Sequence, residues 1–169
     1  IEAGSLVIQE NSFVRNAGTF SFDLAMFFYY ADHSSTEVGN VVLFDAAVDI
    51  LNNSGSEIND AAITLGDRVY NSTLNINGNE FTFENPATAQ EGVFIYGPID
   101  AFSTVSISNN TITDCGVGIE VHTDVTNHSA CTIADNSIIN FRQRGALVDR
   151  TIQNSSLTMN GNTLTGNGT

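Results

Sequence analysis

The 169-residue sequence contains no lysine, and its five basic residues, all arginine, face 19 acidic ones, for a formal net charge of -14. Such a surface repels phosphate backbones and anionic lipids, so neither nucleic acid nor an acidic membrane is expected as a partner. No apolar run approaches the roughly 20 residues that span a bilayer, so no membrane insertion is expected. A charged fraction of 14% and an apolar fraction of 41% indicate a chain that folds around a core.

Proline and cysteine are also scarce. Only two prolines are present, so little interrupts the hydrogen-bond ladders between strands. The two cysteines, Cys115 and Cys131, are too few for a disulfide framework, and their spacing fits no zinc site. A disulfide between them is one alternative. The other is a small buried side chain at Cys131, which occupies a strand position held elsewhere by Leu or Val.

One pattern recurs along the chain: an apolar residue, any residue, Ile or Met, any two residues, Asn, any residue, and a final apolar residue. Five units fit it: Leu6, Ile8, Asn11, Phe13; Leu74, Ile76, Asn79, Phe81; Val105, Ile107, Asn110, Ile112; Cys131, Ile133, Asn136, Ile138; and Leu157, Met159, Asn162, Leu164. In a sixth, Val48, Ile50, Asn53, the final apolar residue is replaced by Gly55. The intervals between units are 42, 26, 31, 26 and 26 residues, which indicates a basic unit of 26 residues with insertions.

Within each unit apolar and polar residues alternate, which is the period of a strand with one buried face. A second apolar segment follows in most units, usually after Gly, as in Gly92–Ile95, Gly118–Val121 and Gly145–Val148, and without that Gly in Ile63–Leu65. Two or three short strands joined by Asn, Gly and Ser turns, with no room for crossover helices, indicate a solenoid whose coils pair in parallel.

The repeat resembles that of right-handed parallel β-helices such as pectate-lyase-like proteins, tailspikes and bacterial adhesins, in which Ile-x-x-Asn-x-Ile followed by Gly-Ile is a common unit. The resemblance covers nearly the whole chain and implies an all-β fold, a single right-handed parallel β-helix over residues 1–169 of about six coils. No cap is visible at either end. An irregular excursion is expected within residues 19–40 and a longer turn within residues 82–91.

The Asn of each unit is predicted to stack on the Asn of the next coil, with the side-chain amides hydrogen-bonded from coil to coil. A residue that merely tolerated the turn would alternate with Asp and Gly, yet Asn stands in every unit. The predicted ladder consists of Asn11, Asn53, Asn79, Asn110, Asn136 and Asn162.

A catalytic set is less evident. Polysaccharide lyases of this fold pair outward acids that hold calcium with a basic residue, and the outward positions of the first strand carry a single acid, Asp49. The basic residues Arg142, Arg144 and Arg150 lie near Asp149 and Asp135 in the sequence and are interpreted as a solvated ion-pair patch, with an anionic-sugar site as the alternative. No matched pair of acids of the kind that glycoside hydrolysis requires is evident in the repeat columns.

No cofactor and no metal site are predicted, with calcium in an acidic turn as an alternative near Asp23 and Asp32 or near Asp114 and Glu120. The histidines follow no metal-binding frame and are interpreted as surface or turn residues; they are His33, His122 and His128.

Six sequons are candidate N-glycosylation sites, at Asn52, Asn71, Asn109, Asn127, Asn154 and Asn167. Asn52 and Asn109 share one register of the repeat, and Asn71 and Asn154 share another. Asn-rich turns give the same pattern without glycan, so both interpretations stay open.

The leading prediction is an extracellular or cell-surface structural or adhesive module, without clear evidence of an enzyme, and with carbohydrate among its expected partners. A carbohydrate-active β-helix, lyase or hydrolase, is the alternative. An ice-binding face on Ser106, Thr132 and Thr158 is a third possibility. Because residues 164–169 followed by residues 1–3 would continue the repeat, head-to-tail association into a fibre is expected, with a fragment of a longer β-helix as its rival.

Overall fold

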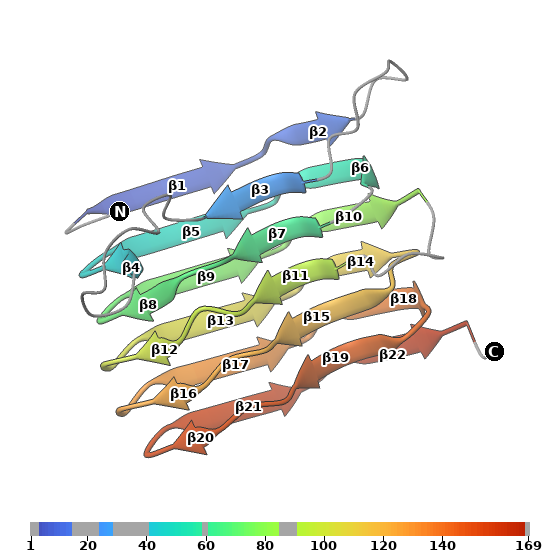
Figure 1. Ribbon diagram of the computed structural model, residues 1–169. Coiled ribbons are helices and arrows are strands. Elements are labelled where there is room, and N and C mark those ends of the chain that lie inside the picture. Colours follow the sequence, from blue (N-terminus) through green and yellow to red (C-terminus); the bar gives the residue numbers. More distant parts are fainter. Residues whose placement is uncertain (1–3, 15–23, 29–40, 59–60, 85–90, 168–169) are drawn as a thin grey trace.

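The fold is a parallel β-solenoid, as the sequence predicts, and the described residues form no helix. A computed structural model describes residues 4–14, 24–28, 41–58, 61–84 and 91–167, and those residues form 22 strands. Every pairing between the described strands is parallel, and successive turns lie side by side from β1 at the blue end to β22 at the red end (Figure 1). No helix that is long and apolar enough to cross a membrane occurs among the described residues.

Sheet 1 contains the first strand of each repeat unit. Its strands, in spatial order, are β1 (Ser5–Gln9), β5 (Ala47–Leu51), β9 (Thr73–Asn77), β13 (Thr104–Ser108), β17 (Ala130–Ala134) and β21 (Ser156–Asn160). The repeat columns are in register throughout, so that Ile50 lies beside Ile76, Ile76 beside Ile107, and Ile107 beside Ile133. The alternating apolar and polar residues of these strands therefore face the core and the solvent in turn.

Sheet 2 follows the Asn turn and contains the last apolar residue of each unit. Its strands are β2 (Ser12–Val14), β6 (Ser54–Ile58), β10 (Glu80–Phe83), β14 (Thr111–Thr113), β18 (Ser137–Phe141) and β22 (Thr163–Gly166). Gly55 pairs with Phe13 on one side and Phe81 on the other, so the degenerate unit keeps the register of the regular ones.

Sheet 3 contains the second apolar segments. Its strands are β3 (Leu24–Phe28), β7 (Ala61–Leu65), β11 (Glu91–Ile95), β15 (Val117–Val121) and β19 (Arg144–Val148). Sheet 4 completes each turn with strands too short to recognise in the sequence: β4 (Val41–Phe44), β8 (Arg68–Tyr70), β12 (Ile99–Asp100), β16 (Val125–Thr126) and β20 (Ile152–Gln153).

The number of coils is smaller than expected. About four turns carry all four strands in close succession, from β5 to β20, and β21 with β22 adds half a turn. Within the predicted excursion, residues 24–28 form β3 in regular pairing with β7, and the rest of residues 19–40 lies outside the described residues. The longer turn predicted at 82–91 is shorter than expected, because β10 extends to Phe83 and β11 begins at Glu91. Residues 85–90 lie outside the described part.

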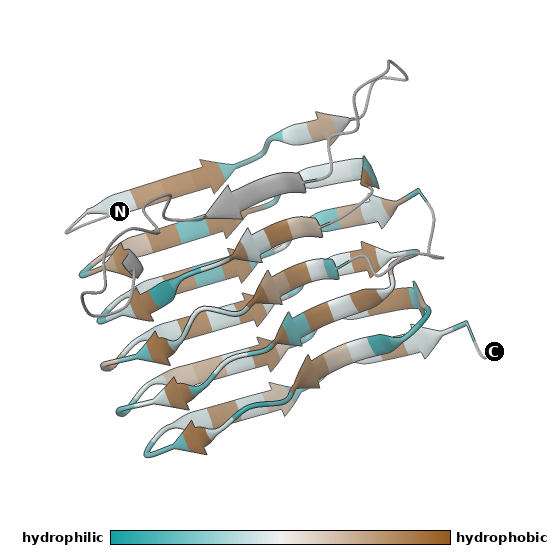
Figure 2. Ribbon diagram, viewed as in Figure 1, coloured by the Kyte–Doolittle hydropathy of each residue, from teal (hydrophilic) through white to brown (hydrophobic). Residues whose placement is uncertain are grey.

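The core is one continuous cluster of buried apolar side chains that extends through successive turns of the solenoid. The ribbon of Figure 2 is brown at hydrophobic residues in turn after turn. Ile50, Ile76, Ile107 and Ile133 of sheet 1 are fully buried and pack with Val93, Ile119 and other residues of sheet 3. Burial of one such side chain contributes about 1.5–3 kcal/mol, so this cluster supplies most of the driving force for folding.

The predicted Asn ladder is present at the turn between sheets 1 and 2. From Asn53 onward, each Asn Oδ1 accepts hydrogen bonds from both the backbone N–H and the side-chain Nδ2 of the Asn one turn earlier, at 2.9 Å for Asn79 on Asn110 and 3.0 Å for Asn110 on Asn136. Each Nδ2 of Asn53, Asn79 and Asn110 also donates to a backbone carbonyl of the preceding turn. The ladder therefore satisfies buried backbone and side-chain groups together.

A second ladder, not predicted from the sequence, lies at the turn between sheets 4 and 1. The Oγ of Ser103 accepts the backbone N–H of Ser72 at 3.2 Å, and Ser129 Oγ accepts the N–H of Ser103 at 3.1 Å. The same bonds join Ala46 to Ser72 and Ser129 to Ser155. Two internal ladders thus hold the two ends of sheet 1.

Candidate functional site

The disulfide, one of the two alternatives for the cysteines, is not formed. Cys115 and Cys131 are both free and both buried, Cys131 in β17 of sheet 1 and Cys115 just after β14 of sheet 2. Burial raises the pKa of each thiol to about 12, which keeps both in the thiol form at neutral pH. Both cysteines are therefore core side chains, which agrees with the alternative of a small buried side chain at Cys131 and not with a disulfide.

The six sequon asparagines are all exposed, and five of them occupy turn positions with positive φ. Asn71 Nδ2 donates to Asp45 at 2.6 Å, and Asn127 Nδ2 donates to Asp100 at 2.6 Å. Burial acts to raise the pKa of Asp100, but hydrogen bonds from Asn127, Ala101 N–H and Thr126 outweigh it and leave the pKa below its usual value. Exposure leaves glycosylation open as a prediction.

The expected patch of arginines and acids is only partly assembled. Arg150 Nε lies 3.9 Å from the carboxylate of Asp149. Asp135 lies instead in the turn between β17 and β18, where its side chain packs against Gly161. Arg144 begins β19 and Arg142 precedes it, both exposed.

The residues proposed for calcium do not meet as expected. Asp23 and Asp32 lie outside the described residues. Asp114 accepts a hydrogen bond from Asn140 Nδ2 at 3.0 Å and does not belong to the group of potential metal ligands that contains Glu120. Among the described residues that group brings Glu120 together with His122 and Asp149 instead.

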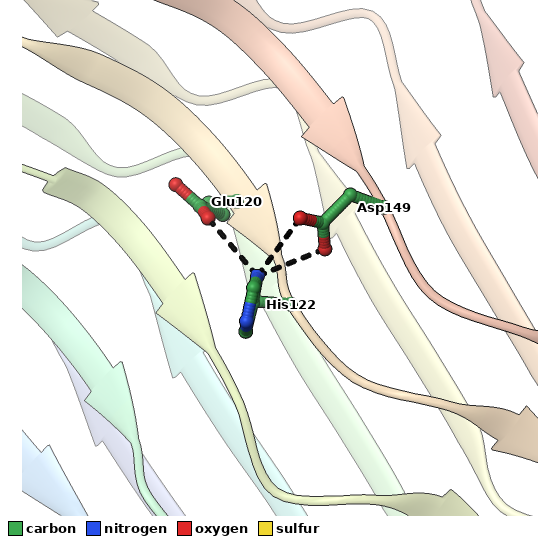
Figure 3. Close-up of side chains that lie close together, drawn as sticks. All are labelled: Glu120, His122 and Asp149. Atoms are coloured by element: carbon green, nitrogen blue, oxygen red, sulfur yellow. Dashed lines mark hydrogen bonds and ion pairs between the residues drawn. The ribbon is translucent and has the colours of Figure 1, made fainter.

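The cluster of Glu120, His122 and Asp149 lies on the outer face of sheet 3, with both carboxylates directed toward one ring nitrogen of His122 (Figure 3). His122 Nδ1 is 2.9 and 3.0 Å from the two carboxylate oxygens of Asp149 and 3.5 Å from Glu120 Oε1. The three donor atoms lie within 4.8 Å of one another. We take this cluster as the candidate site.

Arg150 contacts the imidazole at its other ring nitrogen. Its Nη2 lies against His122 Nε2, and because a guanidinium has only donors, Nε2 accepts in this contact. Nδ1 is then the ring nitrogen that donates to Asp149. The site therefore holds two carboxylates and one guanidinium around the imidazole.

The register of β15 and β19 creates this arrangement. Val121 pairs with Val148, so the next residue of each strand, His122 and Asp149, follow side by side as the chain leaves the sheet. Glu120 is two residues before His122, so its side chain leaves the same face. Sequence reasoning treated His122 as an isolated histidine and Asp149 as part of an arginine patch, although alignment on Gly118 and Gly145 would have placed them together.

An aromatic pair borders the cluster on the neighbouring turn. Phe94 pairs in register with Glu120, and Tyr96 follows Ile95, which pairs with Val121. The rings of Phe94 and Tyr96 contact each other with centroids 5.3 Å apart, and Tyr96 is 38% exposed. The exposed ring of Tyr96 and the half-buried ring of Phe94 therefore lie beside the polar cluster on paired strands.

On the other side of the cluster lies an open hollow lined by His122, Thr123, Asp124, Arg150 and Thr151. Asp124 accepts the backbone N–H of Thr151 at 3.0 Å, which fixes its carboxylate at the rim. Glu120, His122 and Asp149 are the described residues that could ligate a metal ion. Coordination through Nδ1 would move the ring proton to Nε2, toward the guanidinium of Arg150, which opposes such binding.

The remaining predicted surface residues lie elsewhere. Ser106, Thr132 and Thr158 form one column on the outer face of sheet 1, as the sequence predicts. His128 stacks on Phe102 at the turn between sheets 4 and 1, with ring centroids 5.2 Å apart. His33 lies outside the described residues.

In comparisons with known proteins, no family model, curated protein or solved structure matches this chain.

Proposed function

We propose that this chain is an extracellular adhesive β-solenoid that binds carbohydrate through the outer face of sheet 3. The observation that carries the proposal is the contact between the half-buried Phe94 and the exposed Tyr96, which lie beside the carboxylates, imidazole and guanidinium of the candidate site. The C–H face of a sugar ring packs on an aromatic ring, while its hydroxyls need precisely such charged donors and acceptors at the edge.

The scaffold supports this proposal. The Asn and Ser ladders fix the backbone of each turn relative to the next, so that side chains on the outer face are held at a constant separation of about 4.8 Å between turns. A site built on paired strands is better ordered than a site on loops, which favours binding of a rigid, repeating ligand.

The test is binding to a panel of soluble oligosaccharides and insoluble polysaccharides. Tyr96→Ala is expected to weaken carbohydrate binding about tenfold, because a stacked ring contributes about 1–1.5 kcal/mol. Phe102→Ala is the matched control, since Phe102 is 70% exposed and lies at the turn before sheet 1, away from the site. Equal binding by the Tyr96 variant and the wild type, or no carbohydrate binding at all, would contradict the proposal.

Glycosylation is a further prediction of the extracellular location. In material from the source organism we expect glycan on one or more of the exposed sequons Asn52, Asn71, Asn109 and Asn154. A mass-spectrometric peptide map checks this, with Asn75 as an internal non-sequon control. Unmodified peptides at all four sites would remove this support for a secreted protein.

A hydrolase is the second candidate function, favoured by one observation: carboxylate oxygens of Glu120 and Asp149 lie within 4.8 Å of each other. Retaining glycosidases hold their two carboxyl groups at about 5–5.5 Å. New reducing ends released from a polysaccharide by the wild type and not by Glu120→Gln would favour this function over simple adhesion.

Head-to-tail association of copies stays a prediction from the sequence. Sedimentation of the purified protein over a range of concentrations would detect such association. This prediction does not depend on the candidate site.

A further inference from the structure

The carboxylate of Glu120 is held in an apolar setting. Its side chain is 14% exposed, and its register neighbours on sheet 3 are Phe94 on one turn and Leu147 on the other. A charge with few water contacts gains more from an added cation than a fully solvated one does. A cation that binds at this site is therefore expected to gain the most free energy from its contact with the Glu120 carboxylate.

The charges inside the site do not balance. Glu120 and Asp149 contribute two negative charges, and Arg150 contributes one positive charge. Asp124 adds a further carboxylate at the rim of the hollow. A ligand that brings a positive charge between Glu120 and Asp149 would reduce this excess of negative charge.

Three kinds of ligand can be compared on these grounds. A uronic acid would place its carboxylate against Glu120, Asp149 and a chain of net charge -14, which is repulsive. A metal ion on Nδ1 is opposed by Arg150 and makes no use of the aromatic pair. An organic ammonium on a ring uses both, since the ammonium pairs with the carboxylates and the ring packs on Tyr96.

We propose that the site binds basic sugars, whose rings carry a free ammonium group, as in glucosamine oligosaccharides. The ammonium lies between Glu120 and Asp149, and the neighbouring sugar ring packs on Tyr96. This inference rests on the proposed carbohydrate binding and adds the class of sugar. It differs from the anionic-sugar site that was the alternative interpretation of Arg142, Arg144 and Arg150 from the sequence.

The experiment is titration calorimetry of the wild type with three hexasaccharides: glucosamine with free protonated amines, N-acetylglucosamine, and galacturonic acid. We expect the glucosamine hexamer to bind at least about tenfold more tightly than the acetylated one, and the galacturonate hexamer to bind least. Glu120→Gln and Asp149→Asn should each remove most of this preference, because each lowers the affinity for the glucosamine hexamer far more than the affinity for the acetylated one.

The matched control is Asp49→Asn, which removes the same charge from the outer face of sheet 1 and should keep the preference. Loss of preference in that variant as well would show that net charge alone attracts the amines, which overturns the inference. Equal binding of the free and acetylated hexamers overturns it too but leaves the proposed function standing. No binding of any hexamer overturns the inference, and no binding anywhere in the wider panel of oligosaccharides and polysaccharides would also contradict the proposed function.

Zn²⁺ provides a last discriminating probe. If Zn²⁺ binds the wild type in a manner lost in Glu120→Gln, and the glucosamine preference is absent, the cluster is a metal site and the inference fails. Circular dichroism of each variant establishes that its fold is retained, and the preference of the wild type needs no variant to measure.

Discussion

Asn110→Ala is expected to lower the free energy of unfolding by about 3–5 kcal/mol. The side chain of Asn110 accepts two hydrogen bonds from Asn79 and donates one each to Asn136 and Ile76 O, at 2.9–3.0 Å. Alanine replaces all four with nothing, and it leaves buried donors of Asn79 without an acceptor, which costs more than the bonds themselves contribute. Urea denaturation followed by circular dichroism measures the change.

The control is an Asn of the same solenoid that lies outside the ladder. Asn75 on the outer face of β9 donates one side-chain bond, to Asp49 at 3.2 Å, so Asn75→Ala should cost less than about 1 kcal/mol. Asn11, at the exposed end of the ladder, should give an intermediate value. Similar losses in the three variants would show that the ladder contributes nothing beyond ordinary polar contacts.

The parts of the fold that the sequence predicted are those in which one residue type is required at one position. The Asn ladder needs an acceptor and two donors on a short side chain, and Asn at every unit made the column visible. The Ile and Leu columns of sheet 1 were visible for the same reason, because a buried strand position inside a solenoid admits only apolar residues.

Other parts were missed because their residues are common in turns for several reasons. Ser72, Ser103 and Ser129 form a ladder, yet Ser before a strand is ordinary turn chemistry. Sheet 4 was not recognised since strands such as β12 (Ile99–Asp100) hold two residues, too few to show alternation. The candidate site depends on which residues of β15 and β19 pair, and unit lengths that differ by one residue change that pairing.

The glycines that precede the second apolar segments show how the sequence motif arises from packing. Gly92, Gly118 and Gly145 hold the same register position in β11, β15 and β19. A methyl group at each of them would meet the large apolar side chain of sheet 2 in the following turn; these side chains are Ile112, Ile138 and Leu164. The large apolar residue of sheet 2 and the Gly of sheet 3 thus recur together in the sequence because they contact each other across successive turns.

β7 departs from this motif because it has Ala at the glycine position, and the packing around it explains why. Ala62 stands at the glycine position, fully buried. In the following turn the large side chain of sheet 2 is Phe81, and its ring packs over Gly55, where an added Cβ would lie 3.0 Å from it. The glycine that makes room for Phe81 is therefore in sheet 2, which frees the position in sheet 3 for Ala.

Gly118→Ala is accordingly expected to destabilise the solenoid by about 2–3 kcal/mol. The new methyl would overlap the carbonyl oxygen of Gly145 and the branched side chain of Ile138, and a paired backbone carbonyl cannot move without disturbing β19. Gly145→Ala is the matched control, because its nearest contacts are ring and methyl atoms of Phe141 and Leu164 at 3.0 Å, which can shift, and its cost should stay below about 1 kcal/mol. The double variant Gly118→Ala, Ile138→Val should recover little stability, since the clash with the carbonyl remains.

Equal unfolding midpoints for the two glycine variants, or full recovery in the double variant, would contradict this prediction. Either result would show that the strands can move apart, and that the close approach of the Gly145 carbonyl is not the reason for glycine at position 118.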